Sequence, residues 1–286
     1  MNAAKDVEVV VSSIFGIISG VICTPLLTRT AYLFYTHPDY RELNSYRLMA
    51  HHGVCYSLFG PLYVTLFIGI LTDSDLGGVV IIASALIQAL WQILLIITLS
   101  LAINRFSVIA NIASMDYASK IVSVLGAAFG IAYFVILMTP LAGLQLHDGL
   151  ALYDEAKPLS KVVEQVYAHA CIATTSASLI VYIILFGYIA WKHVKYSLSH
   201  ISKTEKLFAV KALMIALSQF SVECMFIFVR PAVHNNGWKW AGVVMLESSA
   251  MVILPLIILI IFGRNLKKQM FQGLSKTFKR QNGGSA

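Results

Sequence analysis

Seven long runs of apolar residues dominate the chain, and shorter polar stretches separate them. The runs cover residues 9–35, 46–71, 77–103, 120–141, 166–191, 207–230 and 238–262. A helix needs about 20 mainly apolar residues to cross the hydrocarbon core of a bilayer, and each run is long enough. The pattern predicts an all-α membrane protein, with a bundle of seven transmembrane helices in residues 1–262 and a tail in residues 263–286.

The composition supports this interpretation. Hydrophobic residues make up 58% of the 286 residues and charged residues 12%, whereas a soluble domain has roughly 45–50% and 25%. A soluble fold could not bury so much apolar surface. The net charge of +7 is therefore read as loop charge beside a membrane. The expected surroundings are a lipid bilayer, and no nucleic-acid partner is expected.

Lysine and arginine fall unevenly between the two sides of such a bundle. If the N-terminus lies outside, 16 of the 21 basic residues are cytoplasmic, and the outer ones are Lys5, Lys157, Lys161, Arg230 and Lys239. Basic residues concentrate on the cytoplasmic side of membrane proteins. The expected location is therefore the cell membrane, multi-pass, with the N-terminus outside and the C-terminus cytoplasmic.

The tail carries its own periodic pattern. Apolar residues recur every four positions, and lysines and arginines occupy the other faces; the apolar set is Phe262, Leu266, Met270, Leu274 and Phe278. This spacing is typical of a basic amphipathic helix on an anionic inner leaflet. A frayed tail is the alternative, because Gly273 weakens a helix by roughly 1 kcal/mol.

Two pairs of glycines are spaced for close helix packing. Gly16 and Gly20 form a GxxxG step in the first span, and Gly126 and Gly130 form one in the fourth. Small residues at this spacing let two helix backbones approach closely. Chance is the alternative, because glycine is common in membrane helices.

A cluster of polar and charged residues follows the third apolar run. No charge occurs from Leu76 to Ile103, and then Asn104, Arg105 and Phe106 follow together. Arginine keeps its charge and is expensive in hydrocarbon. We therefore expect the helix to leave the hydrocarbon at Asn104 and Arg105 to extend to water at the cytoplasmic interface.

Two carboxylates lie inside predicted spans, where charges are rare and usually face the bundle interior. By a rise of 1.5 Å per residue, Glu223 lies about 10 Å and Glu247 about 13 Å below the outer surface. Further polar or aromatic candidates at this level are Gln88, Trp91, Gln92 and His169. The set predicts an outer-half cavity with polar contacts in apolar walls, which suits a small-molecule ligand. The alternative is hydrogen bonding that only holds the helices together.

The pattern gives no support for an enzyme or a metalloprotein. His51 and His52 are adjacent, so their side chains point about 100° apart on a helix and cannot easily share a metal. The four cysteines lie in apolar runs without zinc-site spacing, which is typical of buried thiols. We expect no metal, no cofactor and no catalytic residues.

Two short motifs resemble those of a known family. Leu101 to Ile109 reads L-A-I-N-R-F-S-V-I, and Asn44 to Met49 reads N-S-Y-R-L-M with Gly53 after it. With seven spans, these motifs resemble the nematode serpentine chemoreceptors, which are G-protein-coupled receptors, and are similar to class T or the related classes X, V and G. The resemblance implies a rhodopsin-like topology. It also implies coupling to a heterotrimeric G protein through Asn104, Arg105 and Phe106, a small environmental or pheromone-like ligand, and a role in sensory perception, with the sensory cilium as a candidate location.

The chain departs from rhodopsin-like receptors in several ways. The middle of the second span, from Tyr56 to Pro61, has no carboxylate, and Pro255 alone matches the Asn-Pro-x-x-Tyr motif. Lys239 lies at the outer lip of the last span, so retinal attachment is not expected. Asn104 replaces the acidic neighbour of the arginine, so a neutral hydrogen bond is expected in place of a resting-state ion pair.

The leading functional hypothesis is thus a receptor that binds a small molecule and activates a G protein. The rival is a polytopic transporter or channel. Transporters often show inverted repeats and paired broken helices; no internal repeat is visible here, and prolines are few within the spans. A membrane-embedded enzyme is the third possibility, and it lacks a supporting set of residues.

Overall fold

The computed structural model describes residues 3–37, 44–147, 150–196, 203–229 and 237–262. The helices α1 (Ala3–Thr36), α3 (Asn44–Thr72), α4 (Val79–Ala110), α5 (Ala113–Leu137) and α6 (Ser160–Tyr196) come first. α7 (Lys203–Cys224) continues into a π-helix, η1 (Met225–Val229). The last span combines α9 (Gly237–Ser248), the π-helix η2 (Ser249–Ile253) and α10 (Leu254–Phe262). The predicted tail helix, residues 263–286, lies outside the described residues.

Seven of these helical segments are long and apolar enough to cross a membrane, so the seven-span prediction is confirmed. Large apolar side chains on the outside of the bundle remain exposed, among them Ile18, Val124 and Ile183. Such a surface suits lipid and would be unfavourable in water. The protein is a multi-pass membrane protein.

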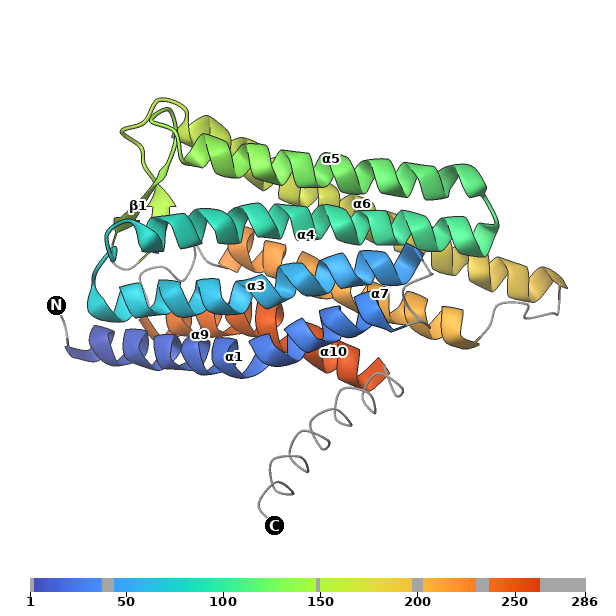
Figure 1. The fold of residues 1–286 in the computed structure, drawn as a ribbon, viewed down its shortest axis with the longest axis horizontal. Helices are drawn as coiled ribbons and strands as arrows, with labels where there is room; N and C mark the ends of the chain where they lie inside the picture. Colours follow the sequence, from blue (N-terminus) through green and yellow to red (C-terminus); the bar gives the residue numbers. More distant parts are fainter. Residues whose placement is uncertain (1–2, 38–43, 148–149, 197–202, 230–236, 263–286) are drawn as a thin grey trace, which may run out of the picture.

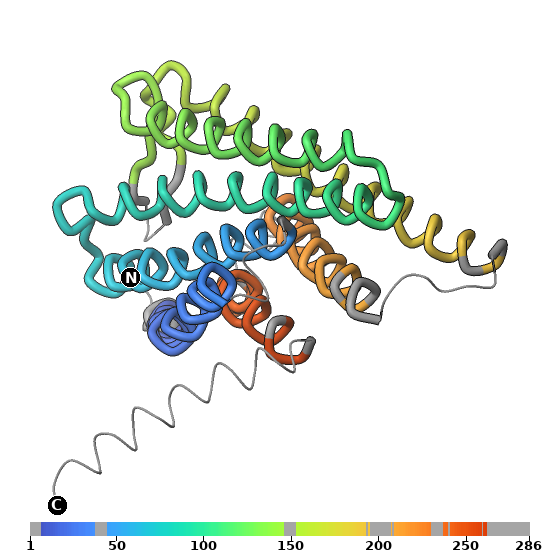
Figure 2. The backbone as a smooth tube through the Cα atoms, turned by 45° about the vertical axis from the view of Figure 1, so that its right-hand side comes forward, coloured from blue at the N-terminus to red at the C-terminus, as the bar shows by residue number. Residues whose placement is uncertain are grey.

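α4 is the central helix of the bundle. In its most apolar stretch 56% of the residues are buried, against 22% in α5. The two views show α5 and α6 on one side of α4, and α1, α3, α9 and α10 on the other (Figures 1 and 2). Large buried side chains around α4 include Tyr56, Phe59, Leu94, Leu101 and Tyr182. Polar side chains on α4 can therefore contact several other helices.

The predicted close packing at the glycine pairs is confirmed. A Cβ atom added at Gly126 would lie 2.3 Å from Cγ2 of Ile96 on α4, and one at Gly130 would lie 2.3 Å from Cγ1 of Ile93. In α1, a Cβ atom at Gly20 would lie 2.9 Å from the carbonyl oxygen of Gly60 on α3. Larger side chains at these positions would push the helices apart.

The third and fourth helices extend beyond the predicted apolar runs. α4 continues past Asn104 to Ala110, and α5 begins at Ala113 rather than near residue 120. Asn111 makes the tight connection in a left-handed conformation, with φ of 60°. Arg105 does not extend to water, because it is only 6% exposed.

The connection between α5 and α6 forms a two-stranded antiparallel hairpin. Strands β1 (Leu144–His147) and β2 (Leu150–Tyr153) pair with Leu144 opposite Tyr153. The buried side chain of Leu144 packs in a small apolar cluster with Ala89, Tyr133 and Leu137. The hairpin lies at the same end of the bundle as the start of α4 (Figure 1). We call this the hairpin end and the opposite end of α4 the Arg105 end.

Candidate ligand cavity and the Arg105 end

A cavity of about 950 Å³ lies among α3, α4, α6, α7 and α9, with the hairpin contributing to its lining. Its volume falls in the usual range for small-molecule sites. Both π-helical segments contribute to the wall, η1 through Phe226 and Ile227 and η2 through Met251. Short π-helical turns inside α-helices are frequent at functional sites.

The most buried polar contact in the lining joins α4 to α7. The indole Nε1 of Trp91 donates to Oε1 of Glu223 across 2.5 Å. Both residues are buried, and Glu223 is 7% exposed. Because an indole N–H can only donate, this bond fixes the carboxyl group as an acceptor. Glu223 is thus held in one orientation at the cavity wall.

The second carboxylate of the lining approaches from α9. The hydroxyl of Tyr63 on α3 donates to Oε1 of Glu247 across 3.4 Å. This distance is long for an O–H···O bond, so the contact holds the carboxylate less firmly than Trp91 holds Glu223. Glu223 and Glu247 nonetheless line the same cavity.

A tyrosine cluster joins the hairpin to α4 and α5. The hydroxyls of Tyr133 and Tyr153 donate to Oε1 of Gln88 across 2.5 and 2.8 Å, and they also contact each other. The ring of Tyr167 stacks on Tyr133 with centroids 4.8 Å apart. Burial raises the pKa of the Tyr153 phenol well above its usual range, so its hydroxyl remains a donor. The cluster fixes Gln88 and one wall of the cavity.

Four of the six predicted ligand contacts lie together in the cavity lining: Gln88, Trp91, Glu223 and Glu247. The other two do not line it. Gln92 is buried beside it and accepts a hydrogen bond from Sγ of Cys171 at 3.0 Å. His169 is exposed, and its ring contacts the carbonyl oxygen of Gln165. Because Ala168 lines the cavity, the next residue along α6 points away from it.

A second polar layer lies between the cavity and the Arg105 end. Nε2 of Gln219 donates to the Tyr56 hydroxyl across 3.3 Å, and Nε2 of His52 lies 3.0 Å from Oγ1 of Thr98. His51 is exposed and packs near Tyr35 instead. Within the described ranges, no group of three or more His, Cys, Asp or Glu side chains could hold a metal ion.

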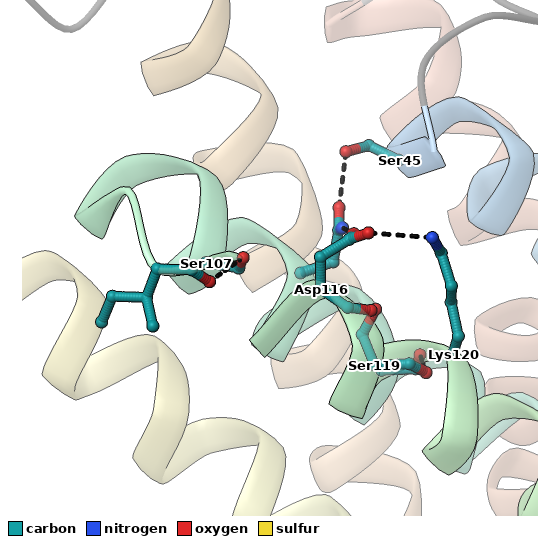
Figure 3. A network of polar contacts seen from close by, with 8 residues as sticks. Ser45, Ser107, Asp116, Ser119 and Lys120 are labelled. Atoms are coloured by element: carbon teal, nitrogen blue, oxygen red, sulfur yellow. Dashed lines mark hydrogen bonds and ion pairs between the residues drawn. The ribbon is translucent and has the colours of Figure 1, made fainter. Parts of the chain in front are cut away.

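At the Arg105 end, Asn104 connects three helices. Its Nδ2 atom donates to Oδ1 of Asp116 on α5 across 2.7 Å, and its Oδ1 atom accepts from Ser45 on α3 across 2.6 Å. Asp116 also pairs with Lys120 at 3.0 Å, and Figure 3 shows Asp116 between Ser45 and Lys120. Asn104 thus makes a neutral bond with Ser45, as expected, and a second bond to a carboxylate, which is charge-assisted.

Arg105 and Phe106 point toward other helices. Arg105 is buried near Tyr46 of α3 and Tyr182 of α6. The ring of Phe106 packs against Tyr188 of α6, edge to face, with centroids 6.0 Å apart. Each of the three residues predicted for G-protein coupling thus contacts a neighbouring helix.

Sequence reasoning missed Asp116, Tyr63 and Tyr153. The signal for Asp116 was its position four residues before Lys120, which is a pairing distance on a helix. Tyr63 follows Tyr56 and Phe59 in steps of three and four residues on one face of α3, so it could have been placed inside. Tyr153 gave no comparable signal, because its position depends on the hairpin.

Comparison with known proteins shows a likeness of fold. No family model matches the sequence, and no curated protein matches it. Among solved structures, the crystal structure of squid rhodopsin superposes with a TM-score of 0.67. The match covers 95% of this chain and 87% of the rhodopsin chain at 11% sequence identity. The predicted rhodopsin-like seven-helix topology is therefore confirmed.

Proposed function

We propose that this chain is a G-protein-coupled chemosensory receptor. A small molecule binds in the cavity at the hairpin end, and a heterotrimeric G protein binds at the Arg105 end. The observation that carries the proposal is the arrangement along α4, which contributes Gln88 and Trp91 to the cavity and Asn104 and Arg105 to the opposite end. The rhodopsin-like fold supports it.

The ligand side has the features of a small-molecule site. Mainly apolar and aromatic walls carry a few fixed polar groups, among them the Gln88 amide and the Glu223 carboxyl. Such walls provide burial, and such polar groups provide orientation. Both glutamates therefore have a position from which they can contact a bound molecule.

The G-protein side rests on Arg105 and its neighbours. In receptors with an arginine at this place, the family resemblance implies that it faces the cavity that opens for the G protein. Here Arg105 is buried between α3 and α6, and Asn104 connects α4 to α5 and α3. We interpret this arrangement as the resting state.

The charge pattern supports the proposed orientation. With the hairpin end outside, most lysines and arginines lie on the cytoplasmic side. The Leu101–Ile109 and Asn44–Met49 motifs further support a receptor of the nematode chemoreceptor type, for which the sensory cilium is the candidate location.

Nucleotide exchange tests this function. The purified receptor is reconstituted with a panel of heterotrimeric G proteins, and GTP-analogue binding is measured with and without pools of small molecules. We expect at least one G protein to respond, and we expect Arg105→Ala to abolish the response while Arg47→Ala, a change at an exposed arginine of α3, preserves it.

The contrary outcomes are equally clear. Full signalling by Arg105→Ala would reduce that arginine to a structural or topological role. Solute uptake or ion flux in proteoliposomes, without exchange on any G protein, would favour the transporter or channel hypothesis.

A further inference from the structure

We infer that the molecule recognised in the cavity is an organic cation, an amine or quaternary ammonium compound with an apolar body. This inference rests on the proposed function, because it assigns a chemical class to the ligand of that same cavity. Three features of the cavity carry it: the sign of its charges, the aromatic character of its wall and the way its deepest carboxyl group is held.

The charged residues of the lining are predominantly acidic. Four glutamates line the cavity against a single lysine, and the set is Glu155, Glu164, Glu223, Glu247 and Lys161. The lysine is exposed, as are Glu155 and Glu164, so these three residues place two negative charges and one positive charge near solvent. The deeper pair, Glu223 and Glu247, faces the cavity from α7 and α9. An anionic ligand would meet like charge there, whereas a cation would meet opposite charge.

Aromatic rings surround the deeper part of the cavity. Tyr63 and Phe67 on α3, Trp91 on α4, Tyr167 on α6 and Phe226 on η1 all line it. The face of an aromatic ring attracts a cation, and cages of such rings are typical recognition sites for quaternary ammonium groups. Aromatic faces combined with carboxylates therefore favour an ammonium group over a neutral polar one.

Glu223 is held by a neutral donor. Its described hydrogen bond comes from the Trp91 indole. Within the residues that the structure describes, no lysine or arginine forms an ion pair with it. A carboxylate that is 7% exposed is costly to keep charged without a cationic partner. A ligand ammonium would supply that partner inside the bundle.

The volume of the cavity indicates the size of the part of the ligand that is not charged. About 950 Å³ is near the upper end of the range for small-molecule sites. A bare ammonium or metal ion would leave most of this apolar space unfilled. The ligand that fits therefore carries an apolar body against the aromatic and aliphatic walls and places its cationic group near Glu223 and Glu247.

Three probes of one skeleton test the charge preference: phenylpropyltrimethylammonium, phenylpropanol and phenylpropanoate. The purified full-length receptor in a nonionic detergent is titrated with each, and the shift of its unfolding temperature is measured. The quaternary ammonium probe keeps its charge at every pH, so titration of the probe does not confuse the result. We expect the cation to bind about tenfold or more tightly than the alcohol, and the carboxylate most weakly.

Variants localise the effect. Glu223→Gln and Glu247→Gln remove the deep charges and are expected to reduce the preference for the cation over the alcohol about tenfold when combined. Glu8→Gln is the matched control, because Glu8 is a buried glutamate of α1 that does not line the cavity. Equal binding of all three probes, tighter binding of the carboxylate, or an unchanged preference in the double variant would overturn the inference.

Nucleotide exchange and probe binding, measured on the same receptor preparation, test this inference and the proposed function independently. Nucleotide exchange stimulated by a neutral or anionic compound, and lost in Arg105→Ala, would support the receptor but overturn the cationic ligand. Selective binding of the cation without exchange on any G protein would support the cationic ligand and count against the receptor.

Discussion

The side-chain amide of Asn104 on α4 donates a hydrogen bond of 2.7 Å to the carboxylate of Asp116 on α5. The two residues are only 12 positions apart, because the helices are joined by a tight turn at Asn111. An acid is thus present beside Asn104, but on the next helix. The contact ties the Arg105 end of α4 to α5.

Loss of the Asp116 carboxylate should weaken the connection between α4 and α5. Asp116→Ala leaves the buried amide of Asn104 without its acceptor, which costs about 1–3 kcal/mol in the resting state. We expect basal nucleotide exchange to rise severalfold at matched surface expression. Lys120→Ala is the control, because it removes only the exposed partner of Asp116, and such surface pairs contribute little. Equal basal activity in both variants would show that the Asn104 contact does not restrain the receptor.

The contact between Asn104 and Asp116 changes the expected effect of Asn104→Asp. From the sequence, an aspartate at position 104 would be expected to pair with Arg105 and lower basal activity. In the structure it would face Asp116 within hydrogen-bond distance, and two carboxylates repel. We expect Asn104→Asp alone to lower the unfolding temperature and raise basal exchange.

A double variant tests whether repulsion between the two carboxylates causes the effects expected of Asn104→Asp. Asn104→Asp combined with Asp116→Asn exchanges acceptor and donor and restores one amide–carboxylate bond. We expect it to recover much of the stability and the low basal exchange, with a coupling energy of about 0.5–3 kcal/mol between the sites. Strictly additive effects would indicate that the two side chains do not interact in the membrane.

Orientation can be tested at exposed positions of the two ends. Glu155 precedes α6 at the hairpin end and Asn111 ends α4 at the Arg105 end, and both are exposed. On intact cells, Glu155→Cys should react with an impermeant thiol reagent, and Asn111→Cys should react only after permeabilisation. The native cysteines are at least partly buried, so the unmodified chain provides the background. The reverse labelling pattern would invert the proposed topology.

The sequence could predict the spans because each depends on local composition. Runs of apolar residues are long enough to identify seven helices whatever their neighbours. It could not predict that Arg105 is buried, because its burial depends on how α3 and α6 pack beside it, with Tyr46 and Tyr182 nearby. Residues 104–119 contain enough serine, asparagine and charge to be interpreted as a loop, although partners across the α4–α5 turn allow both helices to extend into this stretch.

In the candidate ligand cavity, too, some residues could be predicted from the sequence and others could not. Glu223 and Glu247 could be found as rare charges inside spans, and Gln88 and Trp91 by their level on α4. Gln92 and His169 were predicted as ligand contacts because they are close in sequence to other candidates. The sequence did not determine the direction in which either side chain points. The contribution of Tyr153 required knowledge of the hairpin, whose register with Leu144 is a tertiary property.

Close packing between α4 and α5 predicts a strong effect of a single methyl group. A Cβ atom at Gly126 would lie 2.3 and 2.7 Å from two atoms of the Ile96 side chain, so Gly126→Ala should destabilise the fold by about 1–3 kcal/mol through overpacking. Gly187→Ala is the matched control, since nothing lies within 4 Å of its added Cβ and alanine favours the helix. Thermal unfolding in detergent measures both. Equal unfolding temperatures would mean that α5 can shift away from α4 at little cost.

The hydroxyl of Tyr153 predicts how firmly the hairpin is held beside the cavity. It donates to Oε1 of Gln88 across 2.8 Å, and Tyr133 donates to the same atom across 2.5 Å. Tyr153→Phe therefore removes one bond but leaves the Gln88 carbonyl group with a partner, so we expect a loss of only about 0.5–1.5 kcal/mol in stability. The local effect should be larger, because this bond joins β2 directly to α4. Amide hydrogen exchange in residues 144–147 should accelerate severalfold, while exchange in the buried middle of α4 should remain unchanged. Tyr117→Phe, at an exposed position of α5, removes a hydroxyl away from the hairpin and serves as the control. If exchange in the hairpin is the same in both variants, packing of Leu144 and the β1–β2 pairing hold it in place, and the Tyr153 hydroxyl is dispensable for that purpose.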